Sequence, residues 1–128
     1  MSDAATLTSP APRPPVRRSG RSARRRTPGD RLRDALMALG ECRGQILTHE
    51  EKPWASITFA GTRHRLAILF AGEEAVEAGE IFVAELPEHE FAIPGQLVAD
   101  ATVSGTQHRL LPAPRLVVEC ELLLLEES

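Results

Sequence analysis

Two histidines in nearly identical surroundings are the residues of this chain whose type could support chemistry. The segments 61–66 and 105–110 differ at one position in six, so His64 and His108 hold equivalent places, each followed by an arginine. Imidazole nitrogens bind zinc or iron and titrate near neutral pH. A carboxylate from the last predicted strand would complete such a set. The candidate metal ligands are His64, His108, Glu119 and Glu121.

A second interpretation of these histidines is that they are hydrogen-bonded surface residues. Their separation of 44 residues is the spacing of the repeat and matches no metal motif. Two further clusters of acids around a histidine, at residues 49–51 and 88–90, are expected in loops. Neighbouring carboxylates raise the pKa of a histidine, so these clusters could form a pH-sensitive surface or be solvated charges. No cofactor is predicted.

The chain lacks the motifs of phosphate-binding P-loops, of nucleophile elbows, of H-E-x-x-H metal sites and of dinucleotide-binding turns. The one lysine, Lys52, precedes a proline outside any glycine-rich loop, and no G-x-S-x-G, H-E-x-x-H or G-x-G-x-x-G pattern occurs. Cys42 and Cys120 are too few for a disulfide framework, and no apolar run approaches the 18 residues of a membrane span. These observations favour a cytoplasmic, non-enzymatic protein. The predominance of arginine over lysine is typical of bacteria with GC-rich genomes.

Charge is distributed unevenly along the chain. Residues 1–28 carry a net charge of +6, whereas residues 29–128 carry −9. The tail, residues 1–27, holds four prolines and shows no hydrophobic periodicity, so we expect it to be disordered. Its arginines could contact a nucleic-acid backbone, although they could also solubilise the chain, fold back onto the acidic domain or reflect a start codon placed too far upstream. The candidate contacts are Arg17, Arg18, Arg21, Arg24, Arg25 and Arg26.

Hydrophobic periodicity predicts the elements of the remaining chain, residues 28–128, as one acidic domain. Thr27 as N-cap and Pro28 at the first helical position begin a helix that ends at Gly40. A second helix is expected over residues 72–86. Strands are predicted at 45–49, 54–60, 63–70, 90–93, 97–104 and 115–126, with turns at 61–62 and 105–106.

The repeat extends beyond its six-residue core and suggests an internal duplication. Residues 54–66 and 98–110 match at seven of thirteen positions without a gap. We therefore predict an α+β, two-layer domain, with two helices on one face of a mostly antiparallel sheet of five to six strands and an internal αβββ duplication. The alternative is a small β-barrel with one capping helix, which would follow if residues 80–84 form a strand.

The last predicted strand, 115–126, is apolar on both faces. Such a strand is either central in its sheet or covered by a second subunit. A terminal strand often lies at a sheet edge, where pairing with another chain would cover it, and on this second interpretation we predict a homodimer. Trp54 is either an anchor for a partner or a core residue. The candidate interface residues are Val117, Leu123, Leu125 and Trp54.

Three functions remain from the sequence. The first is a small interaction or regulatory module that self-associates or binds a protein partner. The second is a nucleic-acid-associated protein that uses its arginine-rich arm. The third is a small metal-dependent or acid–base enzyme built on His64 and His108. No membrane partner is expected, and the sequence identifies neither ligand nor process.

Overall fold

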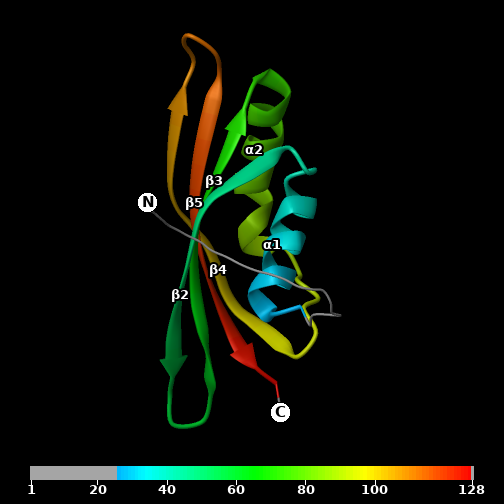
Figure 1. Ribbon diagram of the computed structural model, residues 1–128, viewed down its shortest axis with the longest axis vertical. Helices are drawn as coiled ribbons and strands as arrows, with labels where there is room; N and C mark the ends of the chain where they lie inside the picture. The colour runs from blue at the N-terminus through cyan, green and yellow to red at the C-terminus, as the bar shows by residue number, and fades with distance from the viewer. Residues whose placement is uncertain (1–25, 128) are drawn as a thin grey trace, which may run out of the picture.

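The computed structural model describes residues 26–127 as an α+β domain with one open antiparallel sheet and two helices on one of its faces (Figure 1). The elements are α1 (Pro28–Leu39), β2 (Gly44–Ala55), β3 (Ala60–Ala71), α2 (Glu73–Glu85), a 3-10 turn (Leu86–Glu88), β4 (Gln96–Arg109) and β5 (Arg115–Glu126). The sheet order is β2-β3-β5-β4. The predicted fold class is confirmed, but the sheet has four strands where five to six were expected, and its free edges do not support the barrel alternative.

The first helix begins where the sequence predicts. The Thr27 hydroxyl accepts a hydrogen bond from the Asp30 N–H at 3.0 Å, and the Asp30 carboxylate accepts one from the Thr27 N–H at 3.0 Å. This capping box satisfies two backbone donors that have no partner inside the helix. The inward face of α1 buries Leu32 and Leu36 completely, which fixes the helix against the sheet.

The hydrophobic core lies between the helices and the facing side of the sheet. Phe70 of β3 meets Phe82 of α2 with ring centroids 5.7 Å apart. At Gly79 a Cβ atom would come within 2.8 Å of the Phe70 ring, so glycine permits α2 to approach the sheet this closely. The alternation of β3 and β5 supplies the other side of the core, with the buried residues Leu66, Ile68, Leu116, Val118, Cys120, Leu122 and Leu124.

The first hairpin differs from its prediction. The polar residues 50–53 were expected to end a strand, but β2 continues through them and merges two predicted strands into one. The chain turns at residues 56–59, where the Ser56 N–H donates to the Phe59 carbonyl at 2.7 Å, and not at residues 61–62. Ile57 and Phe59, which belong to the predicted strand 54–60, are 103% and 51% exposed because they lie at the turn.

The second hairpin removes the basis for the duplication. Gly105 and Thr106 were predicted to form a turn, yet they lie inside β4 opposite Glu119 and Val118 of β5. The chain reverses at residues 110–114, where the prolines interrupt the ladder. Helix–strand–strand order occurs twice, but the repeated sequence lies in β3 the first time and in β4 the second. The αβββ duplication is therefore not confirmed.

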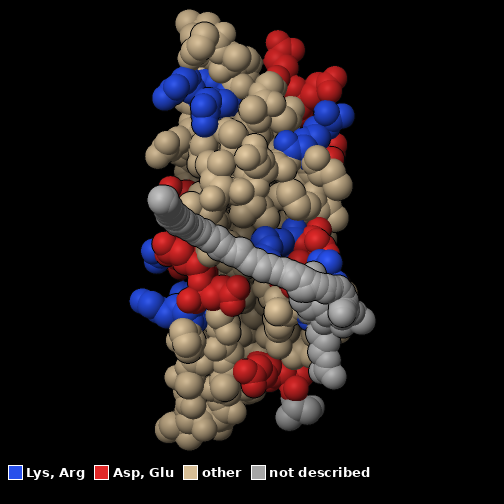
Figure 2. Space-filling model, viewed as in Figure 1, with Lys and Arg blue, Asp and Glu red and all other residues tan. Residues whose placement is uncertain are grey.

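Both hairpins extend beyond the helices, at opposite ends of the molecule (Figure 1). Residues 53–62 carry no charged side chain, and Figure 2 shows the corresponding end of the surface without blue or red. The other tip exposes Leu110 and Leu111 at 67% and 78%. Neither described helix has the length and apolar character needed to cross a lipid bilayer.

Candidate functional site

The four predicted metal ligands are not brought together by the fold. His64 and His108 pair with Leu122 and Leu116 of β5, six residues apart, which corresponds to roughly 20 Å along the strand. Glu119 and Glu121 alternate with the buried residues of β5 and therefore lie on the face of the sheet away from the helices. His64 is completely buried on the helix side, whereas His108 is exposed.

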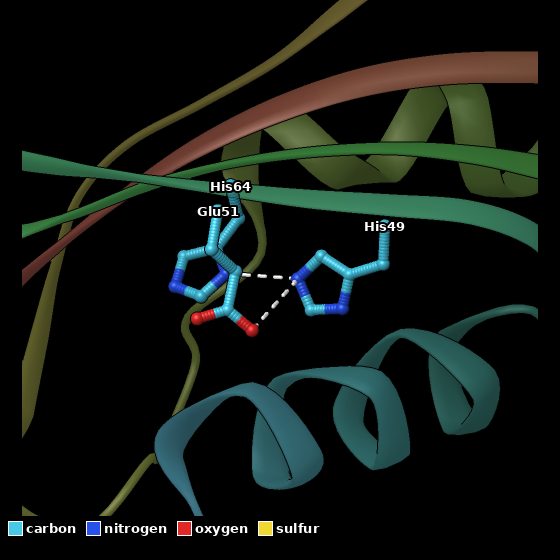
Figure 3. A group of neighbouring side chains, drawn as sticks. All are labelled: His49, Glu51 and His64. Carbon is cyan, nitrogen blue, oxygen red and sulfur yellow. Dashed lines mark hydrogen bonds and ion pairs between the residues drawn. The ribbon is translucent and has the colours of Figure 1, made fainter. Parts of the chain in front are cut away.

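His64 instead meets two residues of the neighbouring strand (Figure 3). His49 and Glu51 are two positions apart on β2 and so share a face, and Glu51 stands opposite His64 in the β2–β3 register. The His49 Nε2 and His64 Nδ1 atoms are 2.9 Å apart, and His49 Nε2 is 3.9 Å from Glu51 Oε2. The sequence shows the acid–histidine cluster at 49–51. Its contact with His64 depends on the β2–β3 register, which the spacing of the residues in the sequence does not reveal.

The N-terminal half of α1 covers this cluster. Arg33 Nη1 lies 2.6 Å from His49 Nδ1, and the same guanidinium forms an ion pair with Asp30. The pKa of Asp30 is lowered, chiefly because its carboxylate accepts the Thr27 backbone N–H, and Arg33 adds to this effect. Helix capping and the histidine cluster are thus joined through one arginine.

The hydrogen bonds determine which nitrogens carry protons. A guanidinium can only donate, so His49 Nδ1 must accept from Arg33 and the proton of the neutral ring is on Nε2. His49 Nε2–H then donates to His64 Nδ1, which leaves the His64 proton on Nε2. That Nε2 atom is buried and has no hydrogen-bond partner among the described residues. The chain of contacts therefore ends in an unsatisfied donor.

Burial favours the neutral form of both rings. The pKa values of His49 and His64 are lowered, first by desolvation, and the Glu51 carboxylate opposes that shift in both. The arrangement has no place for an additional proton: protonation of His64 Nδ1 would make two N–H groups face each other, and protonation of His49 Nδ1 would oppose Arg33.

These residues could also be considered as a metal centre, because one atom each of His49, Glu51 and His64 lies within 4.8 Å of the other two. A histidine that binds a metal through one nitrogen donates the N–H of its other nitrogen to an acceptor. His49 has the opposite arrangement, since its Nδ1 accepts from the cationic Arg33. The geometry thus favours a neutral, hydrogen-bonded histidine pair over a metal centre.

The predicted interface residues all lie on the open face of the sheet, the face that the helices leave uncovered. Of the two positions that the sequence left open for β5, the central one is found, because β5 lies between β3 and β4 and not at an edge. On this face Leu123 and Leu125 are already buried within one chain, at 8% and 7% exposed, and Val117 and Trp54 are partly buried.

Further side chains complete the open face. Leu97 of β4 pairs with Leu125 and is 50% exposed, and it is not among the predicted interface residues. The middle of the face carries charges of both signs on adjacent strands. Glu121 of β5 lies 3.2 Å from Arg65 and 3.9 Å from Arg63 of β3. The sequence could not place Leu97 beside the predicted interface, because that position depends on the pairing of β4 with β5.

The predicted nucleic-acid contacts fall almost entirely outside the described residues, as does the predicted tail to which they belong. Arg17, Arg18, Arg21, Arg24 and Arg25 are in that part of the chain. Arg26 is described, and its guanidinium pairs with the Asp34 carboxylate and donates to the Asp30 carbonyl. This arginine therefore contacts the acidic domain itself.

Comparison with known proteins gives little further information. No protein-family model matches the chain, and no curated protein matches it. Among solved structures, the type 4 fimbrial biogenesis protein PilO from Pseudomonas aeruginosa is similar at 12% identity and a TM-score of 0.40. The match covers 77% of this chain and 66% of that one. We base no conclusion on a likeness this weak.

Proposed function

We propose that this protein is a small non-enzymatic interaction module that self-associates through the open face of its sheet. The observation that carries the proposal is one uncovered sheet face with apolar side chains at its ends and charges of both signs between them. Trp54 and Leu97 supply partly exposed apolar surface, and Arg65 stands beside Glu121 at the centre. A face that carries both signs on neighbouring strands is electrostatically complementary to itself.

The two edge strands make association by sheet extension less favourable. β2 contains Lys52, Pro53 and a register shift between Ile46 and Thr48. β4 has two register shifts, after Val98 and after Val103. Bulges, lysine and proline are the features by which natural sheets discourage pairing at their edges. Face-to-face packing therefore remains as the better route to a dimer.

The area of the open face is adequate for a specific complex. Four strands spaced by about 4.8 Å, with about ten residues each at 3.4 Å, make a face of roughly 650 Å². Two such faces would bury roughly 1,300 Å² together, which is within the range of stable interfaces. The cytoplasmic location predicted from the unpaired cysteines stays part of this proposal.

Sedimentation velocity from about 1 to 100 μM tests self-association. We expect the mass to rise toward twice the 14.0 kDa of one chain. Leu97→Glu places a charge on a half-exposed position of the open face and should shift the protein toward monomer without unfolding it. The matched control is Leu111→Glu in the β4–β5 loop, 78% exposed and outside the face. A single-chain mass throughout this concentration range would overturn the proposal.

A further inference from the structure

We propose that the two copies are related by a two-fold axis that runs parallel to the strands, midway between β3 and β5. This inference rests on the proposed function and specifies the geometry of its partner. The strand order β2-β3-β5-β4 makes the consequence simple. Rotation about that axis places β3 over the partner's β5 and β2 over the partner's β4. We call a set of register partners across the four strands a row. Each row then faces the same row of the partner, read in the opposite direction.

The twist of the sheet is compatible with this axis. A twisted sheet rotated by 180° about a line parallel to its central strands keeps its hand of twist. The two faces can therefore stay at the usual separation of about 10 Å along their whole length. The interface is isologous, so each favourable contact occurs twice.

The row nearest the β2–β3 hairpin is apolar. Trp54, Gly61, Leu125 and Leu97 are successive register partners across the four strands. In the proposed dimer, Trp54 faces the partner's Leu97, and Leu125 faces the partner's Gly61. Trp54 and Leu97 are the members of this row with partly exposed side chains, so their contact supplies its apolar burial. At the other end of the face, Leu69 and Val117 are register partners, and each would face the other residue in the partner.

The next row supplies the charge pair that distinguishes this axis. Lys52 of β2 and Asp100 of β4 occupy the two ends of a row whose central members are Arg63 and Leu123. Three strand spacings, about 14 Å, separate them within one chain. Neither forms an ion pair with another described residue. The proposed axis brings Lys52 over the partner's Asp100 and Asp100 over the partner's Lys52.

The central row agrees with the same arrangement. Arg65 and Glu121 are register partners on β3 and β5, so the axis places Arg65 over the partner's Glu121. An axis in the same plane but perpendicular to the strands, passing through the middle of the face, would place Glu121 over the partner's Glu119. Facing carboxylates repel. Charge complementarity therefore selects the parallel axis.

A charge-swap experiment on the full chain tests the inference. Lys52→Glu alone would set two acids against each other at both contacts, and Asp100→Lys alone would set two lysines against each other. Each single variant should therefore dimerise about tenfold more weakly than the unmodified chain, or worse.

An equimolar mixture of the two single variants should recover tight association as a heterodimer. At one contact the glutamate introduced in the first chain faces the lysine introduced in the second. At the other contact the unaltered Asp100 of the first chain faces the unaltered Lys52 of the second. Sedimentation velocity measures all four samples, including a Lys52→Glu/Asp100→Lys double variant, which should also dimerise.

Control variants with the same charge changes on the helix layer separate geometry from net charge. Arg31→Glu on α1 and Glu77→Lys on α2 are exposed and distant from the open face. They should leave the dissociation constant within about twofold. If both single swaps dimerise like the unmodified chain and the mixture gains nothing, the axis is wrong while self-association still stands. A monomeric unmodified chain would instead overturn the proposed function.

Discussion

Replacement of the buried His64 by leucine should stabilise this protein, although substitution of a fully buried residue usually destabilises. His64 is completely buried and its Nε2–H has no partner among the described residues. An unsatisfied buried donor costs about 1–3 kcal/mol. Leucine has a similar volume, carries no polar atom and is already the residue type of the surrounding core, so the substitution removes that cost without opening a cavity.

The expected gain is reduced by one lost hydrogen bond. His49 Nε2–H would no longer have His64 as its acceptor, a loss of about 0.5–1.5 kcal/mol. Glu51 Oε2 is 3.9 Å from the same nitrogen and half-exposed, so a small movement allows it to accept instead. The free energy of unfolding should therefore rise by about 0.5–1.5 kcal/mol, which corresponds to roughly 2–10 °C in Tm for a domain of this size.

The same variant should change the dependence of stability on pH. The pKa values of His49 and His64 are lowered in the folded state by burial. The unfolded chain therefore binds more protons as pH falls below the ordinary histidine pKa of about 6.5. The stability of the unmodified protein is fully present above that pH and is lost as the pH falls toward the lowered values. With His64 removed, the loss between pH 7.5 and 5.5 should be smaller.

Urea unfolding at pH 7.5 and 5.5, followed by the fluorescence of Trp54, measures both effects. The matched control is His108→Leu on β4, where the histidine is exposed, and its free energy of unfolding should change by less than about 0.5 kcal/mol at pH 7.5. A loss of more than about 1 kcal/mol in His64→Leu at pH 7.5 would refute the assigned protonation pattern. An unchanged pH dependence would refute the role of burial.

Two further predictions concern the packing of the core. Gly79→Ala would raise helix propensity, but its Cβ would lie 2.8 Å from the Phe70 ring. Thermal unfolding should therefore show a net loss of about 1–2 kcal/mol in the free energy of unfolding, whereas the exposed control Glu80→Ala should change little. A stabilised Gly79→Ala would contradict the close approach of the helix to the sheet. Burial raises the pKa of the Cys120 thiol to about 12, and the nearby Glu121 adds to this shift. A chromogenic disulfide reagent at pH 8 should therefore modify only the exposed Cys42 in the native chain and both thiols after denaturation. Rapid modification of both thiols in the native protein would contradict this.

The sequence was a sound guide to elements whose signals are local. The N-cap, proline and acid at residues 27–30 predicted the start of α1, and the apolar alternation of residues 115–126 predicted β5. α2 was predicted as a helix although residues 80–84, in its C-terminal half, could also have formed a strand. These signals depend on neighbours within one turn of helix or a few strand positions, and tertiary packing did not override them.

The errors arose where local patterns were given long-range meaning. The similarity of residues 61–66 and 105–110 suggested two turns, yet residues 61–66 lie in β3 and residues 105–109 form the C-terminal end of β4. Polar residues 50–53 suggested a loop because they lack the alternation of apolar and polar residues that marks a half-buried strand. β2 lacks this alternation because it is an edge strand. One of its sides faces solvent, and the other carries a cluster of charged residues. The predicted strand therefore ended at His49 and left Glu51 out of the sheet, and the contact of these two residues with His64 was missed.

Composition and periodicity alone determined an α+β domain with helices on one face, an acidic body, and a last strand that is apolar on both sides. Register and strand order, which only the tertiary structure decides, set everything that bears on function. Antiparallel pairing of β2 with β3 placed His64 opposite Glu51, and insertion of β5 between β3 and β4 made its outer side the centre of an open face. A shift of one residue exchanges the two faces of a strand at little cost in local propensity, so the packing of the whole sheet against α1 and α2 is what selects the partners.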